Sequence, residues 1–125
     1  MANASTTGFG LRPIKKVGQT DNVGALTEYS VAASSALISH ACMVQLTADG
    51  VVLASGNTDA NNLGTLNGVF FTDADTNKPT FANFSKASNT ATDIVAFVND
   101  DPRQVYEIMS ADTAFNQNEV GGCAD

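Results

Sequence analysis

The sequence predicts an all-β fold, a small β-sandwich or barrel of short antiparallel strands with an extended N-terminal arm. Apolar runs that fit strands recur about every 8–12 residues, as they do in sandwiches and barrels. Turn-forming residues separate these runs. Charged residues make up only 15% of the 125 residues, below the roughly 25% of ordinary domains, and Asn, Thr, Ser and Gly take their place. This composition favours strands and turns over solvated helices.

The N-terminal arm comprises residues 1–24, and residues 25–125 form the β-rich body. No hydrophobic period emerges in the arm, and Pro13 pushes the residue before it toward an extended conformation. The arm carries too many apolar side chains for a free tail, so we expect them to pack on the body or on a neighbouring subunit. These side chains are Phe9, Leu11, Ile14 and Val17.

The body divides into short runs with the period of a strand. The clearest hairpin signal is Asp49-Gly50 between two apolar runs, which predicts a tight type I′ turn. Ile94–Val98 is the best candidate for a buried strand, because it is a continuous β-branched and aromatic run. Gly68 interrupts another run as a possible bulge. The predicted strands cover residues 28–31, 43–47, 51–54, 66–72, 80–84, 94–98 and 105–109.

Two details of this assignment are specific enough to be checked. In the last predicted strand, alternation places Tyr106 and Ile108 inward and Glu107 outward. The stretch Ala33–Leu46 has an alternative interpretation as a helix, because four of its apolar residues fall on one helical stripe.

Charge divides unevenly between the arm and the body. Arg12, Lys15 and Lys16 lie in the first sixteen residues without any acid, whereas all thirteen acids follow from Asp21 onward against three basic residues. The arm therefore carries +3 and the rest −10, which makes up the net charge of −7. A basic arm on an acidic body is typical of a segment that docks onto a carboxylate-bearing protein surface. The acidic body argues against nucleic acid as a partner.

The sequence also predicts where the protein is made. Residues 29–48 are uncharged, but serines, His40 and Gln45 interrupt them, so we expect no membrane segment. The first seven residues have no apolar stretch of a secretion signal, which indicates synthesis in a cytoplasm. Cys42 and Cys123 are a weak disulfide signal in such a chain, and Cys42 fits a small buried residue.

Catalytic and metal-binding patterns are sparse. His40 is the only histidine, and its neighbour Ser39 would point to the opposite face of a strand, so a Ser-His-Asp triad is not indicated. Asp73-x-Asp75-x-Asn77 resembles the start of a calcium loop, but Lys78 replaces the required glycine and Phe84 the final Glu. We interpret this stretch as a turn. We expect no catalytic residue, no metal and no cofactor, hence no enzyme.

Three blocks in order resemble a family of tailed-bacteriophage head proteins. The first, Gly10-Leu11-Arg12-Pro13-Ile14-Lys15, is similar to that family's opening "GLRPVR/GFRPVK". The second and third blocks are similar to "GV…Y.D…GKP.FS.Y" and "A.V.DDP…FEVQ". Asn77 departs from the pattern, where a glycine is expected. The later blocks comprise residues 66–70, 78–81 and 83–84, then 94–102 and 105–108.

The resemblance implies a structural virion protein, a capsid decoration or cement protein. Such a protein binds the outer surface of the major capsid protein shell, stabilises the phage head and often associates as a homotrimer. We expect Phe81 and Phe84 to form a self-association surface. The alternatives are another head–tail or tail component, or a small β-barrel module that binds carbohydrate on the virion surface. The expected contacts of the arm with the capsid or a neighbouring subunit are Phe9, Leu11, Arg12, Ile14, Lys15 and Lys16.

Overall fold

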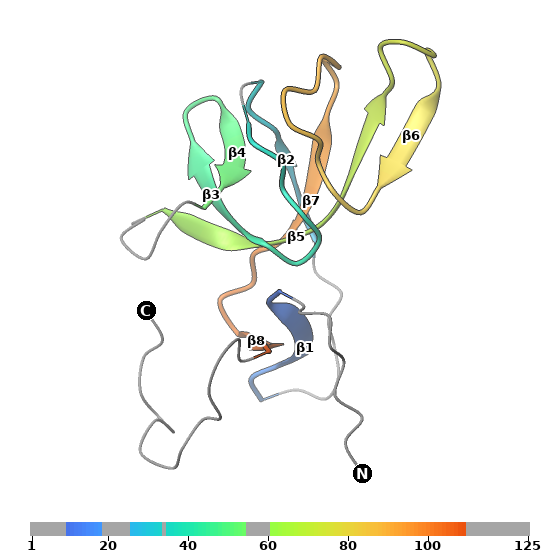
Figure 1. The fold of residues 1–125 in the computed structure, drawn as a ribbon. Helices are drawn as coiled ribbons and strands as arrows, with labels where there is room; N and C mark the ends of the chain where they lie inside the picture. The colour runs from blue at the N-terminus through green and yellow to red at the C-terminus, as the bar shows by residue number, and fades with distance from the viewer. Residues whose placement is uncertain (1–9, 19–25, 34, 55–60, 110–125) are drawn as a thin grey trace.

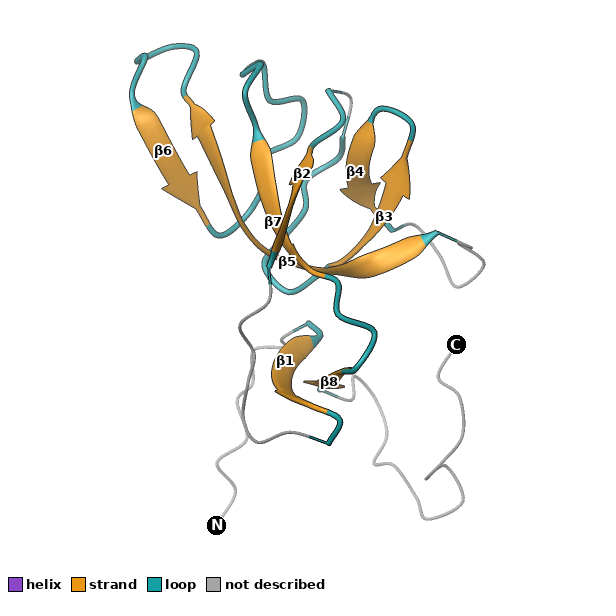
Figure 2. Ribbon diagram, turned by 180° about the vertical axis from the view of Figure 1, so that it is seen from behind, coloured by secondary structure: helices purple, strands orange, loops and turns teal. Residues whose placement is uncertain are grey.

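The computed structural model describes residues 10–18, 26–33, 35–54 and 61–109. Every regular element within these ranges is a β-strand, which confirms the all-β prediction. Two antiparallel sheets result, a ribbon of two strands and a sheet of six (Figures 1 and 2). The strands are β1 (Arg12–Lys16), β2 (Thr27–Ser30), β3 (Met43–Thr47), β4 (Gly50–Leu53), β5 (Asn62–Thr72), β6 (Pro79–Ala82), β7 (Val95–Asn99) and β8 (Gln104–Glu107).

The long strand β5 organises the larger sheet. The strand order is β2-β7-β5-β3-β4, and β6 also pairs with β5. The first part of β5 pairs with β3, and its last part pairs with β6. β7 pairs with the middle of β5 along the opposite edge. The hairpin of β3 and β4 and the hairpin of β5 and β6 therefore diverge from the middle of β5 (Figure 1).

The sheet curls until its two outer strands meet. Val31, just after β2, forms a parallel bridge with Val51 of β4, and the Ala32 amide donates to the Val51 carbonyl at 3.1 Å. Gly50 permits this approach. Its φ is +128°, and a Cβ there would lie 2.6 Å from the Ser30 carbonyl oxygen. The five strands β2, β7, β5, β3 and β4 thus form a nearly closed small barrel, with β2 and β4 as the two edges that meet.

Most of the buried apolar residues in the described ranges form one cluster. Strands β3, β4, β5 and β7 contribute most of it, and two residues outside the strands complete it. Half-buried Cys42 packs against this cluster, in line with its interpretation as a small core residue. The cluster comprises Ile38, Val44, Val51, Leu66, Val69, Phe71, Ile94, Ala96 and Val98.

Two local predictions have opposite outcomes, one for the stretch before β3 and one for Gly68. The helical alternative for Ala33–Leu46 is wrong, because this stretch holds an isolated bridge from Ile38 to Ser85 and then β3. Ser85 and Ile38 exchange backbone hydrogen bonds of 2.9 Å in both directions, which ties the stretch to the sheet rather than to itself. The predicted bulge at Gly68 is confirmed by a register shift between Leu66 and Gly68.

Two further predictions are wrong. Thr47 pairs with Gly50, so Ala48 and Asp49 are the turn residues, and neither has the positive φ that a type I′ turn requires. The positive φ falls on Gly50 instead. Ile108 does not point inward but is 57% exposed, because β8 ends at Glu107 and the alternation ends with it.

The described part of the arm packs on its own chain. β1 pairs with β8 from Arg12↔Glu107 to Lys16↔Gln104, with an irregularity between Pro13 and Lys15. The Leu11 amide donates to the Ala41 carbonyl at 2.9 Å, which attaches the start of the strand to the body. This ribbon lies beyond one end of the six-stranded sheet (Figure 1).

Candidate docking surfaces

The residues with potential catalytic or metal chemistry serve the fold. His40 is exposed, and its Nδ1–H donates to the Asn67 carbonyl at 3.1 Å. Asp73 accepts the amides of Asp75 and Thr76 at 2.8 and 3.2 Å, and these bonds lower the pKa of its carboxyl group. This is the geometry of a capped turn. Within the described ranges, no group of three His, Cys, Asp or Glu side chains could hold a metal ion.

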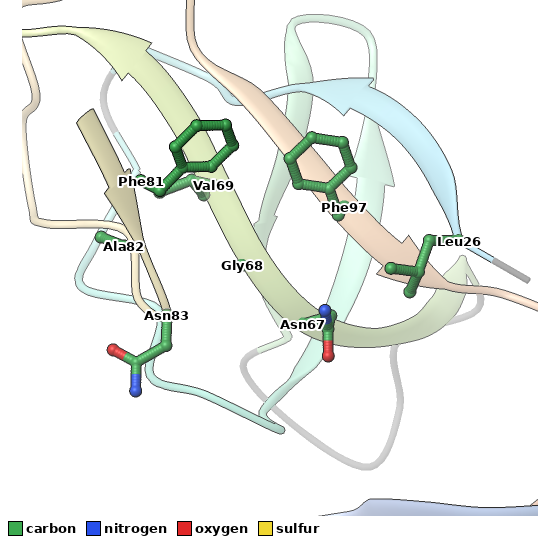
Figure 3. A pocket seen from close by; sticks show the side chains of 8 residues that line it. All are labelled: Leu26, Asn67, Gly68, Val69, Phe81, Ala82, Asn83 and Phe97. Carbon is green, nitrogen blue, oxygen red and sulfur yellow. The ribbon is translucent and has the colours of Figure 1, made fainter. Parts of the chain in front are cut away.

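Among the residues that the structure describes, the most exposed aromatic side chain is Phe81 on β6, which is 77% exposed. It stands beside a shallow groove of about 480 Å³ on the outer face of the larger sheet. Figure 3 shows the rings of Phe81 and Phe97 rising from the same face, with Gly68 between them and Leu26 beyond Phe97. We call this feature the aromatic groove. Its lining carries no charge and comprises Leu26, Asn67, Gly68, Val69, Phe81, Ala82, Asn83 and Phe97.

The register of three strands produces the groove. Phe81 lies opposite Phe70 of β5, and their ring centroids are 4.6 Å apart. Phe97 of β7 lies opposite Gly68 of β5. Because Gly68 has no side chain, nothing on β5 fills the space beside Phe97, and the bulge leaves a hollow on Gly68 rather than a continuous row of side chains.

The two predicted self-association residues, Phe81 and Phe84, differ in their position relative to the groove. Phe81 is a wall of the groove, whereas Phe84 is 45% exposed and lies outside the lining. Sequence reasoning missed Phe97, because the continuous apolar run 94–98 suggested a strand buried on both faces. The structure buries Ala96 and Val98 and leaves Val95 and Phe97 half-buried on the other face. The run itself gave no signal for this, because the half-buried Phe97 is larger and more apolar than the buried Ala96.

A second exposed surface lies on the ribbon of β1 and β8. Ile14 is 37% exposed and Val17 64% exposed, with the exposed cation Lys15 between them. Ile14 and Lys15 belong to β1, and Val17 follows the strand directly, in a turn. The described residues thus carry exposed apolar side chains at the ribbon as well as at the aromatic groove.

Ion pairs and hydrogen bonds fasten the ribbon to the body. The Lys16 ammonium lies 2.9 Å from Asp101 Oδ2, with both side chains largely buried. The Arg103 amide donates to Asp101 Oδ1 at 2.8 Å. The hydrogen bond from Lys16, followed by that from the Arg103 amide, lowers the pKa of the Asp101 carboxyl group. Arg12 forms an ion pair with Glu107 across the ribbon.

A polar seam continues behind these ion pairs. Buried Gln104 donates to the Lys15 carbonyl at 2.9 Å and accepts from Asn99 Nδ2 at 3.2 Å. Tyr106 Oη donates to the Asn99 carbonyl at 3.0 Å. Tyr29 Oη of β2 donates to Asp100 at 2.6 Å, and this hydrogen bond to a carboxylate raises the pKa of Tyr29. Side-chain hydrogen bonding thus orients the ribbon relative to the larger sheet.

The six predicted contact residues of the arm differ in their exposure. Phe9 lies outside the described residues. Lys16 points into the polar seam, where its ammonium group forms an ion pair with Asp101. Leu11 is half-buried, whereas Arg12, Ile14 and Lys15 are exposed.

Comparison of the chain with family models, with curated proteins and with solved structures found no match. The structural model contains no helix long and apolar enough to cross a membrane among the residues it describes.

Proposed function

We propose that this protein is a capsid decoration or cement protein, which binds the outer surface of a bacteriophage head and stabilises it. The observation that carries the proposal is the exposure of Phe81 beside an uncharged apolar groove. Exposed apolar patches with polar surroundings mark surfaces that meet another protein. The three blocks that resemble tailed-phage head proteins name the partner class, the major capsid protein.

The distribution of contacts supports a structural role. The ribbon and the aromatic groove each present apolar side chains, so one molecule can contact more than one neighbour. Many copies on a symmetric shell add modest contacts into strong attachment. In this proposal the protein acts on the virion surface after synthesis in the host cytoplasm, associates with itself as a homotrimer, and needs no cofactor.

A second candidate is a carbohydrate-binding module. The exposed ring of Phe81 and the half-buried ring of Phe97 flank the aromatic groove, and the amides of Asn67 and Asn83 lie at one end of it (Figure 3). Sugars stack on aromatic rings but also require several polar partners. The eight lining residues include only these two polar side chains, so the groove fits an apolar protein side chain better.

The test is co-sedimentation of the full chain with expanded heads that lack decoration. Saturable binding with a fixed number of copies per head is expected. Heads that already carry their decoration are the control, because their sites are occupied. No binding at any protein concentration would overturn the proposal, and a tail component or a glycan-binding module would become the working function. A glycan titration followed by NMR at the Phe81 and Phe97 rings addresses the second candidate.

A further inference from the structure

We propose that the aromatic groove of one molecule receives strand β1 of a second copy of this chain. The inference rests on the proposed function for its biological setting, since decoration requires neighbouring copies. Its physical basis is separate and lies in two exposed surfaces, which differ in shape and charge. The contact is heterologous, because the groove and the ribbon are different parts of the molecule.

The groove supplies a socket. Phe81 and Phe97 form its walls, and Gly68 leaves the space between them empty. The described part of the chain does not cover Phe81, which is 77% exposed. An aliphatic side chain entering here would contact ring faces and exclude water from both partners.

β1 supplies the side chains that fit this socket. Ile14 of β1 and Val17, which directly follows the strand, are exposed aliphatic residues of moderate size. The ion pair between Lys16 and Asp101 holds the backbone between them. A strand fixed in this way loses little conformational freedom on docking, which favours association. Among the exposed apolar residues, these two also flank an exposed cation, Lys15.

The charges beside the groove and on β1 are opposite, which favours β1 as the segment that binds in the groove. Glu28 of β2 lies opposite Phe97 in the register and therefore on the same face, next to the groove. It is exposed and forms no ion pair with a described residue. Lys15 is likewise exposed and carries the opposite charge between Ile14 and Val17. An apolar socket with an acidic neighbour thus faces an apolar strand with a basic side chain.

The contact is small. It involves a few side chains on each partner, compared with about 20–30 residues per side in a standard interface. Association in solution is therefore weak and concentration-dependent. On a head, where copies are held side by side, the same contact is repeated and becomes effective.

The test uses two variants that each disable one surface. Phe81→Asp places a charge on the groove wall, and Val17→Asp places one at the end of β1, on the residue that directly follows the strand. Both positions are mostly exposed, so folding is preserved, as circular dichroism would verify. Sedimentation equilibrium of the wild type should show mass that increases with concentration. Each variant alone should remain monomeric, with association weakened by at least about tenfold.

A mixture of the two variants separates the possible contacts. Each variant keeps one working surface, so a heterologous contact forms one junction and the mixture shows heterodimers. If Val17→Asp alone still associates while Phe81→Asp does not, the contact joins groove to groove and the proposal is wrong. A wild type that stays monomeric at all concentrations also overturns it, and assigns the groove to a different protein.

Charge reversal gives a second readout. Lys15→Glu alone and Glu28→Lys alone should weaken association, and the double variant should restore it in part. Leu46→Asp is the matched control, because Leu46 is an exposed aliphatic residue on β3, outside both surfaces, and should not change the mass. Head binding is measured separately. Self-association without head binding would leave this inference standing and overturn the proposed function.

Discussion

The larger sheet and the ribbon are held together by different forces. The larger sheet encloses an apolar cluster in which Val44, Val51 and Val98 are fully buried. The ribbon has only two strands, and its buried side chains are polar, with Lys16 paired to Asp101 and Gln104 bonded to Asn99. A two-stranded sheet is marginal by itself, so the ribbon depends on this polar seam. The difference shows that burial of apolar side chains stabilises the larger sheet, whereas the position of the ribbon depends on a few polar contacts. We call the larger sheet with its apolar cluster the platform.

The largest expected effect comes from the core of the platform. Leu66→Ala removes a side chain that is 1% exposed, and large-to-small changes of this kind cost about 2–5 kcal/mol through lost burial and the cavity left behind. Urea denaturation should show a lower midpoint with an unchanged slope. Leu46→Ala is the control, because Leu46 is 41% exposed and its loss should cost about 0.5 kcal/mol. Equal losses at both positions would contradict the assigned core.

Acid should loosen the ribbon before the larger sheet. The pKa of the Asp101 carboxyl group lies below its ordinary value of 3.8 because Lys16 and the Arg103 amide bind the charged form. A lowered pKa contributes stability that is present above the unfolded value and lost as the pH falls through the folded one. Below about pH 3.8 the contacts between β1 and β8 should therefore weaken. Cross-strand NOEs between Lys16 and Gln104 measure this.

The acid transition has two controls, a variant that removes the cation and a measurement within the larger sheet. Lys16→Met removes the cation, so the acid-dependent part of the ribbon transition should largely disappear. NOEs between β3 and β4 report on the larger sheet and should persist further into acid. Asp93, in the loop before β7, accepts the Thr72 amide of β5, and this bond lowers the pKa of its carboxyl group, so some loss in that sheet is expected. Loss of both sets of NOEs at the same pH would show that ribbon and platform open together.

The smallest expected effect on stability is that of Phe81→Ser. The ring contacts Phe70 across the strand pair but is mostly exposed, and such pairs contribute about 0.2–1 kcal/mol. Thermal unfolding should therefore change little. A loss as large as that of Leu66→Ala would mean that Phe81 belongs to the core rather than to a docking surface.

Much of the fold followed from local pattern. Alternating patterns and continuous apolar runs located seven of the eight strands in the described residues, and β3 was predicted with its observed bounds of Met43–Thr47. The strand β1 escaped this reasoning, because Arg12–Lys16 has Pro13 and three cations rather than an alternating pattern. Its strand geometry comes from pairing with β8, about ninety residues away in the chain, and no local window contains that partner.

The candidate site was only partly predictable, for a related reason. Phe81 was identified from sequence, but Phe97, Leu26 and Gly68 come together only through the register of β2, β5, β6 and β7. A shift of one residue in any of these strands would turn the aromatic side chains to the other face. The pairing that sets the register depends on the buried cluster, which forms between distant segments.

The sequence by itself determined the fold class and the separation of a basic arm from an acidic body, because composition and short-range periodicity encode these properties. The tertiary structure decided which side of each strand is exposed and where the charges of the arm point. It turned Lys16 inward to Asp101 and left Lys15 on the surface. Neighbouring residues on a strand face opposite sides, so only long-range pairing could assign those two lysines their different environments.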